Sequence, residues 1–250
     1  RFLGRGRTAA TAAAVSDGAA LSNTVGTVLD PVFALRQRIS IAPGKVARIA
    51  FWTVVAASRD ALLDLIDRHH DRNAYERAKT LAWTQAHVQL NHLDIADGEA
   101  AEFQNLAAPL LYVDQRFRAP SATIIKGAAA QSGLWPLGIS GDLPIVLLRV
   151  GDIENMAQVR QLLRAHEYWR LKQVAVDLVI VNERAVSYRQ DLQAEIEAAL
   201  RRSQSRPRFG EPIAQGSVYT LRAELLTAET RALLQSCARI VLVARDGPIA

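Results

Sequence analysis

Residues 144–150, PIVLLRV, form the most apolar strand-like run of the chain and directly follow a polar turn at residues 138–142. A short run of β-branched residues and leucine favours a buried strand. Glycines in the turn permit positive φ angles and close approach of the backbone, while Ser140 and Asp142 carry acceptors for a backbone N–H or for a ligand. The stretch therefore predicts either a ligand-binding loop or an ordinary entry into a strand, and the sequence leaves both open.

The hydrophobic period changes from that of strands to that of helices near Ser58. Residues 21–57 consist of short alternating runs, and between residues 45 and 56 both faces of the predicted strand carry apolar side chains. A strand of this kind belongs in a β-sandwich, yet this segment supplies few strands. We therefore expect a sandwich that is completed by strands outside this sequence.

Helical spacing of apolar residues dominates the rest of the chain. Helices are predicted over residues 60–70, 73–93, 100–112, 153–175 and 185–203 and from Thr227 onward, with short strands at residues 176–182, 217–223 and 239–244. These strands are too few and too scattered to specify a doubly wound sheet. The expected fold class is α+β and mainly helical.

Composition excludes several classes of protein. Half of the 250 residues are hydrophobic, which suffices for a large core, yet no run approaches the roughly eighteen apolar residues of a membrane-spanning helix. The single cysteine, Cys237, excludes an internal disulfide and a cysteine-clustered zinc site.

The net charge is +5, and basic residues are concentrated at residues 1–7 and 201–208. Because neither cluster carries a nucleic-acid-reading motif, solvated linkers are favoured over a nucleic-acid patch.

The sequence matches known catalytic and cofactor-binding motifs only incompletely. Residues 4–9 match a loose dinucleotide-binding pattern without a preceding strand, and the GISG at residues 138–141 falls one residue short of a nucleophile elbow. The five histidines contain no H-x-x-x-H pair, so no metal site is predicted. His166 lies on the apolar stripe of the helix predicted at residues 153–175, which favours a core residue satisfied by one hydrogen bond over a ligand.

Five polar or aromatic residues are candidates for substrate binding. Trp135 offers a ring face for a sugar, and Ser140 and Asp142 offer acceptors for hydroxyl groups. Asn182 and Glu183 stand at the end of a predicted strand, where a strand delivers polar groups to a rim. For each residue the structural alternative is core packing or turn capping, and it is the favoured one.

Several segments together resemble a known family. They comprise residues 2–8, 24–36, 47–56, 81–90, 131–150, 162–183 and 187–193. In their order and their amino-acid sequences, they are similar to the C-terminal region of bacterial cyclic β-1,2-glucan synthases. This is the region of those synthases that is related to cellobiose phosphorylase, which is a glycoside phosphorylase. The resemblance spans essentially the whole chain.

The resemblance implies an architecture. Residues 1–57 would be the end of a β-sandwich domain, residues 58–115 a helical linker, and residues 116–250 the incomplete first part of an (α/α)6 barrel. The segment 138–146 would then lie near the start of the barrel.

The resemblance also implies a chemistry, inverting phosphorolysis, in which inorganic phosphate is a co-substrate and no other cofactor is needed. In the family the general acid and the phosphate-binding residues lie further along the barrel, so no catalytic residue is assigned here. We expect an inactive fragment of a module that trims β-1,2-glucan and controls its length. Its partners would be β-1,2-glucan and the remainder of the synthase, with no nucleic acid and no membrane span of its own. The expected location is the cytoplasm, at the inner membrane through the parent protein.

Two alternatives of other classes remain. One is a non-catalytic carbohydrate-binding or scaffolding segment. The other is a basic helical module that binds nucleic acid through residues 201–208, and it would show strongly salt-dependent association with DNA.

Overall fold

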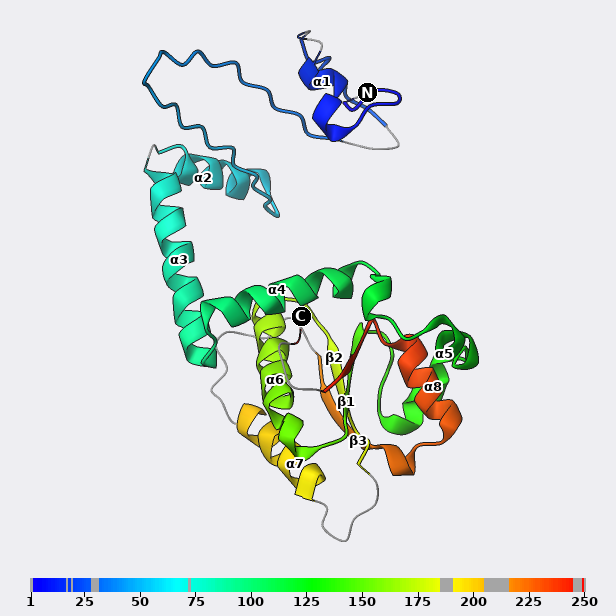
Figure 1. Cartoon of the computed structure of the whole chain (residues 1–250). Coiled ribbons are helices and arrows are strands. Elements are labelled where there is room, and N and C mark those ends of the chain that lie inside the picture. The colour runs from blue at the N-terminus through cyan, green and yellow to red at the C-terminus, as the bar shows by residue number, and fades with distance from the viewer. Residues whose placement is uncertain are drawn as a thin grey trace. The chain divides into compact units, whose positions relative to one another are not determined.

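The computed structural model describes residues 2–16, 18, 20–27, 32–71, 73–184, 191–204, 216–244 and 249. About half of the chain is helical, with one small parallel sheet. The chain divides into two compact units, residues 1–75 and 76–250. Each is described by itself (Figure 1).

The described residues of the first unit contain little regular structure. Its elements are a 3-10 turn at Ala9–Thr11 and helices α1 (Ala13–Ser16) and α2 (Arg59–His69). The strands predicted over residues 21–57 are not formed by the described residues of that range. A strand requires a hydrogen-bonding partner, and the described residues of this range do not pair with one another as strands.

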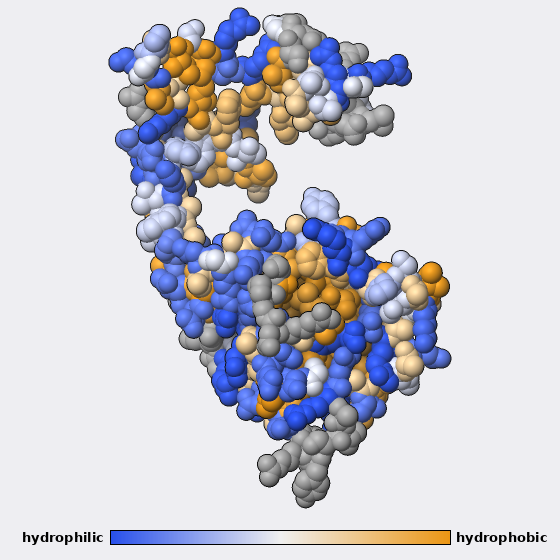
Figure 2. Space-filling model, in the orientation of Figure 1, coloured by the Kyte–Doolittle hydropathy of each residue, from blue (hydrophilic) through white to orange (hydrophobic). Residues whose placement is uncertain are grey.

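Apolar side chains of this unit are exposed as a consequence. Figure 2 shows hydrophobic surface over it. The exposed large hydrophobic residues between positions 32 and 57 are Val32, Phe33, Leu35, Ile39, Ile41, Val46, Ile49, Phe51, Trp52 and Val55. Exposed apolar residues gathered in this way are typical of a surface that another part of a protein covers.

The second unit contains one parallel sheet. Its strands are β1 (Ile145–Val150), β2 (Asp177–Asn182), β3 (Val218–Arg222) and β4 (Ile240–Val243), in the order β3-β2-β1-β4. Helices α6 (Met156–Leu171), α7 (Asp191–Gln204) and α8 (Ala228–Cys237) connect successive strands. The elements before β1 are α3 (Ala74–Leu93), α4 (Asp97–Leu111), α5 (Ser121–Lys126) and 3-10 turns at Gln115–Phe117 and Gln131–Leu137.

Helices cover both faces of this sheet (Figure 1). Alternate residues of the central strands point to opposite faces, so Val146 and Leu148 join a core with α4, α6 and α7, while Ile145 and Leu147 join a core with α8 and the turn at Gln131–Leu137. The judgement that the strands are too scattered for such a sheet was wrong. Strands β1 and β2 are buried almost throughout, which is typical of parallel strands covered on both sides.

The described part of residues 116–250 therefore differs from the expected start of an (α/α)6 barrel. A barrel of that type consists of helix pairs, whereas these residues alternate strand and helix. Helix α4, within the predicted linker, also belongs to the core of this unit, because Phe103, Leu106 and Leu110 are buried in it. No helix among the described residues is both long and apolar enough to cross a membrane.

Candidate functional site

Strand order points to one edge of the sheet as the place for a ligand. The chain passes from β1 to β2 and β3 on one side and then returns to place β4 on the other side of β1. In open parallel sheets such a reversal opens a crevice at the carboxyl ends of the strands, where ligands bind. Here that edge carries Gly151 and Asp152 after β1, and Asn182 and Glu183 at the end of β2.

Glu183 is held by an arginine of the neighbouring strand. The Arg149 side chain donates two parallel hydrogen bonds to it, Nε to Oε1 at 2.7 Å and Nη2 to Oε2 at 3.1 Å. The backbone N–H of Glu183 also donates to the carbonyl of Val150 at 2.7 Å. The Glu183 carboxylate is thus charge-compensated and held between β1 and β2.

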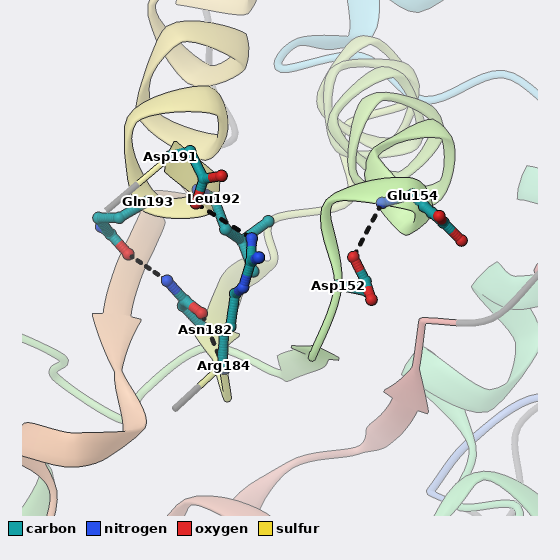
Figure 3. A network of polar contacts seen from close by, with 7 residues as sticks. All are labelled: Asp152, Glu154, Asn182, Arg184, Asp191, Leu192 and Gln193. Atoms are coloured by element: carbon teal, nitrogen blue, oxygen red, sulfur yellow. Dashed lines mark hydrogen bonds and ion pairs between the residues drawn. The ribbon is translucent and has the colours of Figure 1, made fainter. Parts of the chain in front are cut away.

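Asn182 ties the end of β2 to the first turn of α7 (Figure 3). Its Oδ1 accepts the backbone N–H of Arg184 at 3.0 Å, and its Nδ2 donates to Gln193 Oε1 at 3.3 Å. Arg184 in turn pairs with Asp191, Nη1 to Oδ1 at 3.0 Å. The same view shows Asp152 accepting the backbone N–H of Glu154 at 3.4 Å. The polar groups in this network mostly cap turns and helix starts.

Ser140 and Asp142 lie at the opposite edge, before the first residue of β1. Ser140 Oγ accepts the backbone N–H of Asp142 at 3.2 Å, and Gln131 Nε2 donates to the Ser140 carbonyl at 2.8 Å and to Asp142 Oδ1 at 3.0 Å. Gly141 has φ +79°. A Cβ there would come within 2.9 Å of the Gln131 side chain, so the turn requires glycine. These bonds are those of an ordinary strand entry.

The five predicted binding residues therefore do not form one site. Because all the strands are parallel, Ser140 and Asp142 lie at the amino edge while Asn182 and Glu183 lie at the carboxyl edge. Trp135 lies in the turn before β1 and is 62% exposed. A ligand role for any of the five stays a prediction.

The structure places a pocket beside the edge strand β3, and the sequence did not predict it. The pocket has a volume of about 570 Å³. Its lining residues are Pro136, Leu137, Gln193, Glu197, Thr220, Leu221, Arg222, Leu225 and Leu226. Pro136 directly follows Trp135, and Gln193 is the hydrogen-bond partner of Asn182. One sequence signal was available: Gln193 is a polar residue between Leu192 and Ile196 on the buried stripe of α7.

Charges at this pocket are compensated. Gln193 Nε2 donates to Glu197 Oε1 at 3.0 Å, and Glu197 pairs with Arg201 at 3.8 Å. Arg222 pairs with Glu224 at 3.5 Å. The pocket lining is thus polar, and neither the Glu197–Arg201 pair nor the Arg222–Glu224 pair carries a net charge.

Two further ionisable residues, His166 and Asp177, are buried. His166 is 3% exposed, and its Nε2 donates to the Val176 carbonyl at 2.9 Å. Burial lowers the pKa of His166, so the ring is neutral. Asp177, at the start of β2, accepts the backbone N–H of Ser217 at 3.0 Å, and burial raises the pKa of its carboxyl group. The prediction of His166 as a hydrogen-bonded core residue is confirmed.

Among the described residues, no group of three or more histidine, cysteine, aspartate or glutamate side chains could hold a metal ion.

Comparisons with known proteins agree with the resemblance seen in the sequence. Residues 1–72 match the family model described as the supersandwich domain of glycosyl hydrolase 94. The whole chain is similar to the cyclic beta-(1,2)-glucan synthase NdvB of Rhizobium meliloti (strain 1021), with 41% identity over 249 residues. The match covers 100% of this chain and 9% of that synthase. The similarity to cyclic β-1,2-glucan synthases is thereby confirmed.

Proposed function

We propose that this chain acts as a segment of a cyclic β-1,2-glucan synthase, in the part that handles and trims the glucan. The observation that carries the proposal is the 41% identity along the entire chain to such a synthase. The chain spans 9% of the length of that relative, so it would act together with the rest of a synthase polypeptide. We place it in the cytoplasm, held at the inner membrane by that polypeptide.

Residues 1–57 would belong to the end of a β-sandwich. Two observations support this: the family match to a supersandwich domain over residues 1–72, and the exposed apolar residues between positions 32 and 57. Within residues 58–115, α2 and α3 would form a helical connection, whereas α4 belongs to the core of the second unit.

Trimming would proceed by phosphorolysis with inversion, with inorganic phosphate as co-substrate. That reaction requires a carboxylic acid to protonate the glycosidic oxygen and a cationic cradle for phosphate. Carboxylates at the sheet edges and at the start of α7 already have partners: Arg149 for Glu183, Arg184 for Asp191, Gln131 for Asp142, and the backbone N–H of Ser217 for Asp177. We therefore assign the reacting groups to other parts of a synthase and a supporting role to this chain.

A segment exchange tests the proposal. The matching segment of the Rhizobium meliloti synthase is replaced by this chain, and cyclic β-1,2-glucan and its length distribution are measured by mass spectrometry. We expect the chimera to make the cyclic product, whereas a synthase in which the segment is replaced by a flexible linker does not. A chimera that is stably produced but yields no glucan would contradict the proposal.

The supporting role has its own test. The isolated chain is incubated with linear β-1,2-glucan and inorganic phosphate, and we expect no release of glucose 1-phosphate. Rapid release would show that the catalytic groups lie within this chain.

A non-catalytic carbohydrate-binding segment is the second candidate, favoured by the 62% exposed Trp135 next to a lining residue of the β3 pocket. Titration with linear β-1,2-glucan should then change the tryptophan fluorescence. The change should be absent in Trp135→Phe, while Trp83→Phe, which alters an exposed tryptophan of α3, should retain it. A response that survives Trp135→Phe would exclude Trp135 as the contact.

A further inference from the structure

The pocket beside β3 has the size, the walls and the buried polar side chain that are typical of a small-molecule binding site. Three separate parts of the chain form its walls: the turn before β1, the first half of α7, and the end of β3 with the residues after it. Its volume of about 570 Å³ falls within the roughly 300–1,000 Å³ of small-molecule sites. One wall holds Gln193, a polar side chain that is only 9% exposed. A buried amide of this kind is retained where its hydrogen bonds are used.

Unused hydrogen-bonding capacity remains on this wall. Gln193 accepts from Asn182 and donates to Glu197, which leaves one N–H and one lone pair of its amide unassigned among the described residues. Among the described residues, the second carboxylate oxygen of Glu197 has one long contact, with Arg201 at 3.8 Å. Thr220, a hydroxyl-bearing residue of the edge strand, also lines the pocket. Amide, carboxylate and hydroxyl together offer both donors and acceptors, as a sugar hydroxyl requires.

Charge compensation argues against an anionic ligand. Glu197 and Arg222 each have a partner of opposite sign on a neighbouring residue, Arg201 and Glu224 respectively. A phosphate or nucleotide would need cations that are not already neutralised. The remaining lining is apolar, with Pro136, Leu137, Leu225 and Leu226, and such a surface fits the C–H face of a pyranose ring.

We infer that the pocket beside β3 is a saccharide site, in which Gln193, Glu197 and Thr220 hydrogen-bond the hydroxyl groups of a glucose unit. The linkage type of the ligand, β-1,2, rests on the proposed function. The site would hold one unit of the glucan chain beside the edge strand β3. It carries no chemistry of its own.

The test measures binding of a linear β-1,2-linked glucose oligomer to the full chain by titration calorimetry. We expect Glu197→Gln and Thr220→Val each to weaken binding about three- to tenfold, the effect of losing one hydrogen bond. Glu195→Gln is the matched control, because Glu195 lies on the same helix and outside the pocket lining. It should bind as the unchanged chain does. Circular dichroism confirms that each variant is folded.

A second measurement does not depend on the variants. In the methyl NMR spectrum of the unchanged chain, the oligomer should shift the signals of Leu137 and Leu225 on the pocket wall, and leave those of Leu171 in α6 in place. Binding without shifts at Leu137 and Leu225, or equal affinity in Glu197→Gln and Thr220→Val, would overturn the inference. Absence of binding would overturn it too. A working chimeric synthase in the exchange described above would then still support the proposed function, so the two failures are distinguishable.

Discussion

Trp169 of α6 donates its indole N–H to the backbone carbonyl of Phe103 in α4 at 2.8 Å, and both side chains are buried. The bond joins residues 66 positions apart and attaches α4 to the helical layer on one face of the sheet. Helix α4 is therefore an integral part of the α/β unit, although the family resemblance implied a helical linker over residues 58–115.

Replacing Trp169 tests that attachment. Trp169→Phe removes the hydrogen bond and part of the packed ring, and we expect the free energy of unfolding to fall by about 2–3 kcal/mol. Chemical denaturation followed by circular dichroism measures the change. Trp135→Phe is the control, because this exposed tryptophan should alter the stability by less than about 0.5 kcal/mol. Equal effects of the two variants would mean that α4 does not pack as described.

Gly127 marks a close approach of the chain to α8. A Cβ at Gly127 would lie 2.1 Å from the Ala232 carbonyl oxygen, which is backbone and has no room to move. Gly127→Ala should therefore destabilise the protein by about 1–3 kcal/mol or more. Gly98→Ala in α4 meets nothing within 4 Å and should leave stability unchanged or raise it by up to about 1 kcal/mol. Thermal unfolding distinguishes the two, and a neutral Gly127→Ala would contradict the close approach.

The buried His166 predicts how stability depends on pH. Its pKa is lowered in the folded chain, so below the ordinary value of 6.5 the unfolded chain binds more protons than the folded one. Stability should fall as the pH decreases from about 7 to 5, and above pH 7 this contribution is constant. Burial opposes the charged form of the ring, as does Arg170, while the Val176 carbonyl and the carboxylates of Glu167 and Asp177 favour it.

His166→Gln should flatten that dependence between pH 5 and 7, as measured by urea denaturation at several pH values. His70→Gln, at an exposed histidine that follows α2, serves as the control and should keep the slope. An unchanged slope in His166→Gln would show that another group is responsible.

The Arg149–Glu183 pair predicts a measurable coupling across β1 and β2. Each side chain is about one-third exposed, 32% for Arg149 and 29% for Glu183, so water screens the pair in part. A double-mutant cycle with Arg149→Gln and Glu183→Gln should give a coupling energy of about 1 kcal/mol that shrinks at high salt. No coupling at low salt would indicate that the two side chains do not meet.

The helices were largely predictable because their signal is local. Residues 73–93 were predicted as a helix, and α3 occupies Ala74–Leu93. The strands at residues 176–182 and 217–223 were placed within about two residues of β2 and β3. Their assembly was not foreseen, since a sheet is made of contacts between distant segments: Val146 lies beside Leu178 on one side and beside Ile240 on the other.

Some residues of the candidate site could likewise be predicted from local sequence, and others could not. Trp135 and Asn182 were singled out from their local context, and the structure puts each next to a pocket-lining residue, Pro136 and Gln193. Ser140 and Asp142 were singled out from theirs and belong to a turn at the other edge. Thr220 and Glu197 carried no signal of their own, because a threonine in a strand and a glutamate on a helix are common residues.

The amino-acid sequence by itself determined the helices, the short apolar strands and the similarity to glucan synthases, because periodicity and residue identity are properties of consecutive positions. Only the tertiary structure decided that the strands form one parallel sheet and which polar residues meet at its edges. That decision depends on burying both faces of β1 and β2, and burial is a property of segments that meet only after the chain has folded.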